Sequence, residues 1–320
     1  MSACTETRFA YGEALLELGK QRPEVVVLDA DLYKSTRTLL FRDAFPERFI
    51  DVGISEADMV STAAGMAASG LIPYCNSFAV FVTGMCYIPI RTQIAYPALP
   101  VKLIGSSSGL TQGPDGATHQ SLEDISLMRS LPNMVVVSPA DDVETRQATF
   151  ALADWPGPVY MRLGRYPVPR LFNNHYRFAI GKATRLRVGD EVVILATGHI
   201  VSKALKAADE LSRDGVDVGV INVSTIKPLD ETMVREAAAK AGLIVTAEEH
   251  SIIGGLGSAV AECLAETRPA APLLRLGVRD CFGESGFADE LLERHGLQPG
   301  GIRQSILQRM TLLRSDAELV

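Results

Sequence analysis

The hydrophobic positions of the first half of the chain form short β-branched runs that alternate with stretches of helical periodicity. Continuous apolar runs flanked by helices are typical of parallel strands that are buried on both faces of a sheet. We therefore predict buried strands at residues 24–31, 48–53, 71–80, 101–108, 134–140 and 158–163.

This rhythm breaks at Gly164, where prolines, asparagines and aromatic residues predict a connecting segment. The alternation then restarts, and a second set of strands is predicted at residues 191–198, 217–226, 243–249 and 273–278. The pattern indicates an α/β protein with two consecutive α/β domains and mainly parallel sheets. We place the domains at residues 1–172 and 189–320, with a linker at 173–188.

Residues 51–70, DVGISEADMVSTAAGMAASG, predict the end of a strand, a short turn and a helix of mostly small residues. Small side chains allow another group to pack close to the helix backbone, and Glu56 stands at the start of this helix. One interpretation is an acid that the helix dipole stabilises. The other is a buried functional carboxylate, because burial changes the proton affinity of such a group.

The composition predicts a globular protein with substantial cores, since 47% of the 320 residues are hydrophobic and 22% are charged. The net charge of -7 argues against nucleic-acid binding, which requires a basic face. No apolar run has the length of a membrane span, and the amphipathic, charged residues 1–20 predict a helix rather than a signal peptide. The five scattered cysteines include no CxxC pair, which favours free thiols and a cytoplasmic location.

Three polar or glycine-rich stretches follow predicted strands of the first domain, at residues 28–38, 53–58 and 106–120. Ligands of parallel α/β sheets gather at the carboxyl ends of the strands. The glycines of the third stretch also permit tight turns and close approach to a ligand. We therefore expect one ligand site in the first domain, built from all three stretches.

The motifs ISEAD, NSFAVF and SSSGLTQGPDGATHQSLEDISLMRSLPN are followed by INVSTIKPLD and AEEHSIIGGLGSAVAE. In this order, they resemble the pyrimidine-binding and C-terminal domains of the transketolase family over nearly the whole chain. The resemblance implies an enzyme component that uses thiamine diphosphate. A generic nucleotide-binding protein is disfavoured, because no GxGxxG occurs at a strand-to-helix turn.

The resemblance assigns cofactor contacts to Glu56, Phe78 and Phe81. It implies that Glu56 hydrogen-bonds a ring nitrogen of the aminopyrimidine and favours the imino form, which accepts the thiazolium C2 proton. It implies that Phe81 stacks on the aminopyrimidine, and that Phe78 belongs to the same aromatic group, with core packing as the alternative for Phe78. Gly84 stands where typical transketolases have a tyrosine, so part of this pocket is rebuilt or opened.

The resemblance also implies that His119 contacts the substrate and moves protons at its hydroxyl and carbonyl oxygens. Histidine suits this role because its pKa lies near neutrality. Asp115 matches an aspartate that binds a substrate hydroxyl. The structural alternatives are a hydrogen bond within the loop for His119 and an Asp-Gly turn for Asp115.

Arg8 and Ser35 match positions that hold the phosphate of sugar-phosphate substrates, and the alternative for Arg8 is a solvated helix face. Typical transketolases have a phosphate-contacting histidine where this chain has Ser107. Arg162 resembles an arginine of the deoxyxylulose-phosphate synthase branch and is a second candidate for anion binding. His250 is assigned no chemistry.

The sequence lacks the Gly-Asp-Gly and later Asn with which full-length transketolases hold Mg²⁺ and the diphosphate. The resemblance therefore implies an N-terminal transketolase-like partner subunit that supplies these ligands, in a heterotetramer. The expected function is the C-terminal subunit of a split, two-component transketolase that moves a two-carbon ketol unit from a ketose, expected to be a sugar phosphate, to an aldose. The alternatives are a deoxyxylulose-phosphate-synthase-like acyloin enzyme component, an E1 β subunit of a 2-oxo acid dehydrogenase, and a non-catalytic scaffold.

Overall fold

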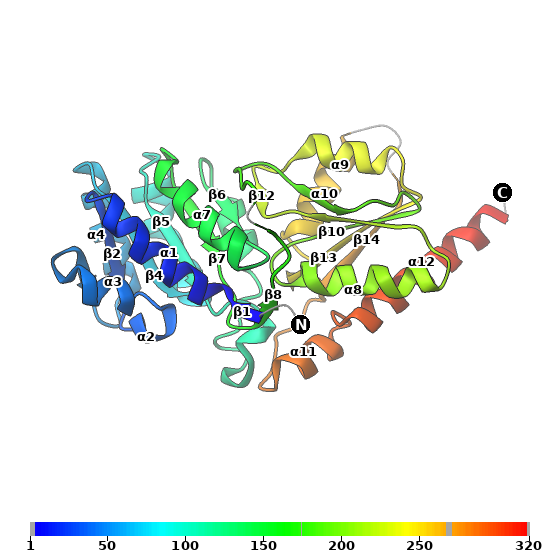
Figure 1. Cartoon of the computed structure of the whole chain (residues 1–320), viewed down its shortest axis with the longest axis horizontal. Coiled ribbons are helices and arrows are strands. Elements are labelled where there is room, and N and C mark those ends of the chain that lie inside the picture. The colour runs from blue at the N-terminus through cyan, green and yellow to red at the C-terminus, as the bar shows by residue number, and fades with distance from the viewer. Residues whose placement is uncertain (1–3, 174, 267–270, 319–320) are drawn as a thin grey trace.

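The computed structural model describes residues 4–173, 175–266 and 271–318. Two α/β domains lie side by side along the long axis of the molecule (Figure 1). Each predicted apolar run contains a strand, and the strands within each domain pair mainly in parallel. The predicted fold class is confirmed.

Among the described residues, the first sheet has seven strands in the order β12-β6-β7-β5-β4-β2-β3, and β12 alone is antiparallel to its neighbour. Its strands are β2 (Val25–Asp29), β3 (Phe49–Asp51), β4 (Ile72–Phe78), β5 (Lys102–Ser106), β6 (Val135–Val137), β7 (Val159–Arg162) and β12 (Thr225–Lys227). The central strands are buried and largely apolar because helices cover both faces, and β2 is buried at every position, including Asp29 at its carboxyl end.

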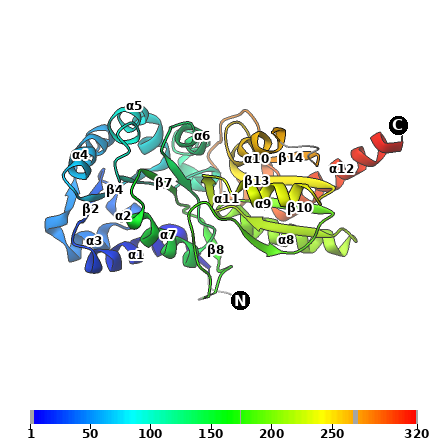
Figure 2. The ribbon, with the colours of Figure 1, turned by 90° about the horizontal axis from the view of Figure 1, so that it is seen from above.

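Helices on the two faces of the first sheet enclose separate apolar clusters (Figure 2). One face carries α1 (Thr7–Gln21), α3 (Leu39–Ala44) and α7 (Asp142–Asp154). The opposite face carries α4 (Glu56–Ala68), α6 (Asp124–Arg129) and the π-helices η2 (Phe81–Met85) and η3 (Ile90–Ala95). The short elements are α2 (Tyr33–Thr36), α5 (Tyr87–Pro89), η1 (Pro46–Arg48) and η4 (Leu110–Asp115).

The second domain repeats this layered arrangement around a sheet of order β14-β13-β10-β11-β9. Its strands are β9 (Thr184–Arg187), β10 (Val192–Ala196), β11 (Val218–Asn222), β13 (Leu243–Ser251) and β14 (Leu273–Val278). One apolar cluster joins this sheet to α8 (Ile200–Arg213), α11 (Ala288–Arg294) and α12 (Pro299–Glu318). Another joins it to α9 (Glu231–Ala238) and α10 (Leu256–Ala265).

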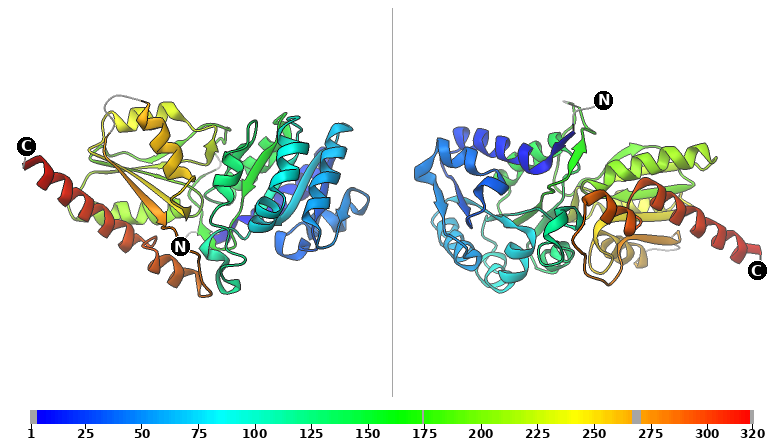
Figure 3. Two further views of the ribbon diagram at one scale, coloured as in Figure 1. Left: turned by 180° about the vertical axis from the view of Figure 1, so that it is seen from behind. Right: turned by 90° about the horizontal axis from the view of Figure 1, so that it is seen from below.

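Helix α12 packs on the second domain only along its first part. Ile302, Ile306 and Met310 lie in the apolar cluster shared with α8. The C-terminal end of α12 extends past the sheet and points away from the body of the protein in both views of Figure 3.

Three short strands change the predicted organisation. β1 (Cys4–Glu6) lies inside the region predicted as a helix, where it pairs antiparallel with β8 (Pro167–Pro169). β9 lies inside the segment predicted as a linker, and it forms the antiparallel edge of the second sheet. β12 comes from the second domain's part of the sequence but joins the first sheet beside β6. Two edge strands therefore connect parts of the chain that the domain assignment separates.

Candidate active site

The candidate residues converge because β3, β2, β4 and β5 pair in parallel, so that their carboxyl ends lie at the same edge of the sheet. Ser35 follows β2 and Glu56 follows β3. Phe78 ends β4, and His119 lies in the β5–α6 loop (residues 107–123). Residues that are far apart in the sequence thus lie in a row along one edge of the sheet.

Glu56 is the first residue of α4 and is buried, with 3% of its surface exposed. Ser77 of β4 donates a hydrogen bond of 2.9 Å from its hydroxyl to Glu56 Oε1. This bond fixes the carboxylate against the strand that ends in Phe78 and leaves Oε2 as the oxygen that can face a ligand. A buried carboxyl group placed in this way can form a hydrogen bond with a bound group.

Phe78, Phe81 and His119 form an aromatic group at the end of β4. The rings of Phe78 and Phe81 are stacked, with centroids 6.0 Å apart and planes inclined by 20°. His119 presents its ring edge-on to both, at 5.3 Å from Phe81 and 6.3 Å from Phe78. Thr118 Oγ1 lies 2.9 Å from His119 Nδ1, so the neighbouring hydroxyl restrains the ring. The arrangement brings a proton-transfer side chain next to a flat apolar surface.

Gly84 and Ser107 mark two departures from the typical transketolase pattern. A Cβ atom placed on Gly84 would meet no other atom within 4 Å. Ser107, which stands where typical transketolases have a histidine, is fully buried at the start of the β5–α6 loop. Neither residue introduces a charge in place of the typical side chain.

Asp115 lies on the exposed side of the β5–α6 loop, four residues before His119. Its carboxylate faces Arg165, with Oδ2 3.3 Å from Arg165 Nη1. Both side chains are more than 40% exposed. Arg165 is a functional candidate that the sequence analysis missed, although it lies only three residues after Arg162 in the same segment.

Arg8 and Ser35, which the resemblance paired, are neighbours in space. Arg8 is in the first turn of α1, and its Nη1 donates to the backbone oxygen of Ser35 at 2.9 Å. Arg8 Nε also donates to Glu6 Oε2 at 2.6 Å. Asp29 fixes the turn before Ser35, because its carboxylate accepts bonds from the Leu32 amide and the Thr36 hydroxyl. An anion bound here would have to share Arg8 with Glu6.

The surroundings of Arg162 favour a structural role over the anion binding suggested by the resemblance. Its side chain is 5% exposed, and its Nε forms an ion pair of 2.8 Å with Asp124. Its Nη2 donates to the backbone oxygen of Glu249 in the second domain at 2.7 Å. A buried arginine with these partners joins the two domains, and it has little capacity left for a substrate anion.

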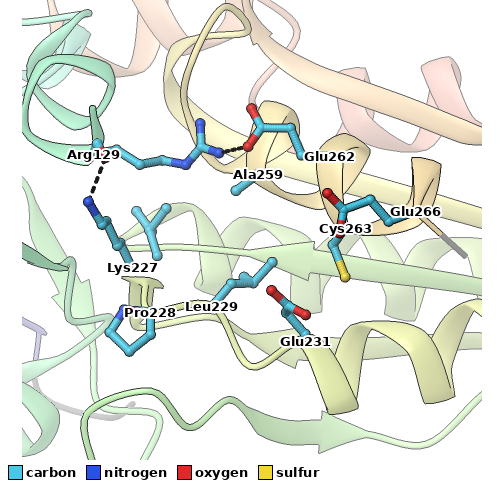
Figure 4. Close-up of a pocket in the computed structure, with 10 residues that line it drawn as sticks. Arg129, Lys227, Pro228, Leu229, Glu231, Ala259, Glu262, Cys263 and Glu266 are labelled. Atoms are coloured by element: carbon cyan, nitrogen blue, oxygen red, sulfur yellow. Dashed lines mark hydrogen bonds and ion pairs between the residues drawn. The ribbon is translucent and has the colours of Figure 1, made fainter. Parts of the chain in front are cut away.

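A separate cavity of about 340 Å³ lies where α6, β12, α9 and α10 meet (Figure 4). It contains none of the candidate residues. Its two basic side chains already have partners in the protein: Arg129 pairs with Glu262, and Lys227 Nζ donates to the backbone oxygen of Arg129 at 2.9 Å. We therefore assign it no part in the chemistry at the strand ends.

Comparisons with known proteins agree with this geometry. The family model described as transketolase, pyrimidine binding domain matches residues 4–169, and the one described as transketolase, C-terminal domain matches residues 181–302. The chain belongs to the transketolase family. Its domains are thus the pyrimidine-binding and C-terminal transketolase domains, and it is a component of a transketolase-type enzyme.

Relatives of similar length are named as parts of split transketolases. A putative transketolase C-terminal section of Methanocaldococcus jannaschii is 43% identical over 95% of this chain and 96% of its own length. The 6-deoxy-6-sulfo-D-fructose transketolase subunit SqwH of a Clostridium species is 46% identical over 91% and 90%. A solved structure described as a split gene transketolase, inactive β4 tetramer, matches with a TM-score of 0.88 and 44% identity, covering 98% of this chain and 99% of that one.

The transketolase family depends on thiamine diphosphate, and the residues at the strand ends fit half of that cofactor. Glu56 offers a buried carboxylate, and the Phe78–Phe81 pair offers a flat apolar surface next to it. The described residues contain no group of three or more His, Cys, Asp or Glu side chains that could hold a metal ion. In the same part of the chain, no helix has the length and apolar character required to cross a membrane.

Two further supporting residues emerge only from the structure. Ser77 holds Glu56, and it lies in a stretch that the sequence analysis used only for its aromatic residues. Glu249 of β13 reaches across the domain junction and accepts hydrogen bonds from Thr111 in the β5–α6 loop. No local sequence pattern marks Glu249, because its partner is 138 residues away.

The adjacent Glu248 is buried at the same junction but bonds within its own domain. Its carboxylate accepts hydrogen bonds from the backbone amides of Leu256 and Gly257, at the start of α10. Burial raises the pKa of Glu248 to about 7. Two residues further, burial lowers the pKa of His250 to about 4. The junction therefore holds groups whose titration changes the stability of the fold in opposite directions.

We expect the Glu248→Gln substitution to reduce the loss of stability that accompanies a rise in pH from about 4.5 to 7. The folded-state pKa of Glu248 is raised above its ordinary value of 4.5, so its contribution is complete below that value and is lost as the pH rises through about 7. The measurement is the thermal unfolding temperature of both proteins from pH 4 to 8. Equal slopes in wild type and variant would contradict the expectation.

Proposed function

We propose that this chain is the C-terminal subunit of a two-component transketolase and forms the pyrimidine side of a thiamine diphosphate site. In this proposal the enzyme transfers a two-carbon ketol unit from a ketose to an aldose. The observation that carries the proposal is the buried Glu56 carboxylate, held by Ser77 beside the stacked Phe78 and Phe81 and within the same site as His119.

Thiamine diphosphate, when bound, supplies the carbon nucleophile for cleavage next to the ketose carbonyl. Glu56 holds a proton against a ring nitrogen of the aminopyrimidine, and its burial keeps that proton from exchanging with water. Phe81 supports the flat ring, with Phe78 stacked behind it. His119 moves protons at the hydroxyl and carbonyl oxygens of the substrate, while Asp115 binds a further hydroxyl.

In this proposal a partner subunit completes the site, because the sequence lacks the Gly-Asp-Gly and later Asn with which full-length transketolases hold the diphosphate and Mg²⁺. Large apolar side chains next to the site support this proposal: Ile54 is 87% exposed two residues before Glu56, and Met85 and Ile88 follow Phe81. We propose that an N-terminal transketolase-like subunit covers them in an α2β2 heterotetramer. The related split-gene transketolase described as an inactive β4 tetramer is consistent with a C-terminal subunit that is inactive alone.

The substrates proposed are small sugars whose distal anionic group lies near Arg8 and Ser35. Arg8 is mostly buried and supplies a fixed guanidinium at the carboxyl edge of the sheet. The name of the Clostridium relative specifies a sulfo-sugar, and this chain has the buried, uncharged Ser107 where typical transketolases have a phosphate-contacting histidine. We therefore propose an anionic sugar as the substrate. Kinetics with charged and uncharged donors distinguish a site that recognises the anion from one that does not.

An acyloin-forming synthase and an E1 β subunit are the alternative reactions. The buried ion pair of Arg162 with Asp124 weakens the one part of the synthase alternative that concerns Arg162 as an anion contact. The relatives that match this chain over their whole length carry transketolase names, which supports ketol transfer. We further propose a cytoplasmic location, in line with the cysteine usage and the acidic net charge.

We expect Glu56→Gln to leave the fold intact and to reduce ketol transfer by about 100- to 10,000-fold, the usual range for loss of a general acid–base group. The amide preserves the size of the side chain and the bond from Ser77, but it cannot exchange a proton with the cofactor. The measurement is turnover of the complex reconstituted with the partner subunit. Ser61→Ala, on the exposed side of the same helix, is the control. Near-normal turnover of Glu56→Gln would remove the proposal.

We expect the isolated chain to bind thiamine diphosphate weakly and without dependence on Mg²⁺. Its residues contact only the pyrimidine half, so the binding free energy of the diphosphate is missing. Calorimetry with the isolated chain and with the reconstituted complex measures the difference. Tight, Mg²⁺-dependent binding to the isolated chain would show that a second subunit is not needed.

We expect Arg8→Ala to raise the KM for an anionic ketose donor by about 10- to 100-fold, the usual cost of one charge-assisted hydrogen bond. The kcat should change less, because the anion lies far from the bond that is cleaved. Steady-state kinetics with a phosphorylated, a sulfonated and an uncharged donor measure the effect. Arg42→Ala, an exposed arginine of α3, is the matched control. A similar change for all three donors would mean that Arg8 binds no substrate anion.

A further inference from the structure

The β5–α6 loop (residues 107–123), which carries Asp115 and His119, packs against the second domain. Leu110 and Leu122 of this loop belong to the apolar cluster of the second domain. Gln120 Nε2 donates to the backbone oxygen of Glu284 at 2.9 Å. Contacts with the second domain therefore help to hold this loop of the first domain in place.

Glu249 of β13 provides the buried polar part of this contact. It is 2% exposed, and its Oε1 accepts a hydrogen bond from the backbone amide of Thr111. The Thr111 hydroxyl donates to Oε2 at 3.2 Å. Gly109 allows this approach, because a Cβ atom at that position would collide with the Glu249 carboxyl group. Any larger residue at 109 would push the loop and the carboxyl group apart.

Glu249 is itself fixed from the other side. His199 Nδ1 lies 3.2 Å from Glu249 Oε2, and Arg162 Nη2 donates to the Glu249 backbone oxygen. Burial, with the nearby charges of Arg162 and Lys203, lowers the pKa of His199 to about 3, so its ring is uncharged at neutral pH. The Glu249 carboxyl group thus lies between the neutral imidazole of His199 and the β5–α6 loop. Its two hydrogen bonds from Thr111 fix the position of Thr111 relative to the second domain.

We propose that Glu249 is a positioning residue: through Thr111, it holds the β5–α6 loop so that Asp115 and His119 meet the substrate. Thr111 is four residues before Asp115 and eight before His119, and Thr111 and Asp115 lie in the same short segment η4, which is kinked at Gly113. Displacement of reacting groups by about 1 Å can cost about 100-fold in rate. This inference rests on the proposed ketol transfer, and it gives the second domain a direct part in the site.

The chain offers a matched control at the next residue. Glu248 is as deeply buried as Glu249, and it too accepts backbone hydrogen bonds. Its donors are the amides at the start of α10, however, and not those of the β5–α6 loop. Substitutions at 248 and 249 therefore remove comparable buried interactions, but only those at 249 act on the loop.

The decisive comparison is between Glu249→Leu and Glu249→Gln in the reconstituted complex. Both substitutions preserve the approximate size of the side chain and remove the acid, but only glutamine can accept a bond from the Thr111 amide. We expect Glu249→Leu to lower kcat/KM by about 10- to 100-fold and to leave the affinity for thiamine diphosphate unchanged. We expect Glu249→Gln to stay within about 3-fold of wild type. Equal activities of the two variants would overturn the proposal.

Glu248→Leu is the control for a general loss of stability. We expect it to lower the unfolding temperature, but to leave kcat/KM per folded complex unchanged. If it lowered kcat/KM as much as Glu249→Leu does, the effect would be structural and the proposal would be overturned. Full activity of Glu56→Gln would contradict the proposed function itself. An inactive Glu56→Gln together with a wild-type kcat/KM for Glu249→Leu would contradict only the positioning role.

A measurement on the wild-type chain does not depend on activity or on the folding of any variant. We expect the Thr111 amide to exchange its hydrogen much more slowly than the amide of Ala117, at the exposed part of the same loop, because Glu249 accepts its hydrogen bond. Amide exchange resolved to single residues measures both. Exchange at Thr111 as fast as at Ala117 would overturn the proposal.

Discussion

The parallel pairing of β3, β2, β4 and β5 is the constraint on which the site depends. Parallel strands require a crossover between them, so each strand ends at the same edge and releases a loop or helix there. Glu56, Phe78 and His119 each follow a different strand, and the sheet brings them together without local sequence proximity. The single hydrogen bond between Ser77 and Glu56 then couples the acid to the strand that carries the aromatic pair.

The junction between the domains is built from polar groups that are unusual in a protein interior. Arg162 pairs with Asp124, while Glu249 contacts His199 and Thr111. Burying such groups costs desolvation free energy, so they stabilise the fold only when their partners are correctly placed. They also give the junction one geometry, because hydrogen bonds are directional where apolar contacts are not. The β5–α6 loop, which carries Asp115 and His119, receives this directional support through Thr111.

Exposed apolar side chains lie close in sequence to the acid and the aromatic pair of the site. A Cβ atom on Gly84 would meet open space, and Ile54 and Met85, which are close in sequence to Glu56 and Phe81, are exposed. A cofactor and a second subunit that cover this region would remove apolar surface from water, which is the main favourable contribution to most association. In the proposed function, the pyrimidine half of the site lies within this chain and a second subunit closes it.

The sequence by itself determined the strands, the α/β class and the family, because apolar periodicity and motifs are local properties of the chain, and it marked Glu56, Phe81 and His119 as candidates. It did not show the contacts of Arg162, since only the fold brings Asp124 and the second domain to that guanidinium. It also missed β12's crossing into the first sheet and the reach of Glu249 to Thr111. These contacts join residues that are tens to more than a hundred positions apart, and no local pattern records a partner at that distance. Tertiary structure decided them through burial, which forces each enclosed polar group to find a partner wherever the packed chain provides one.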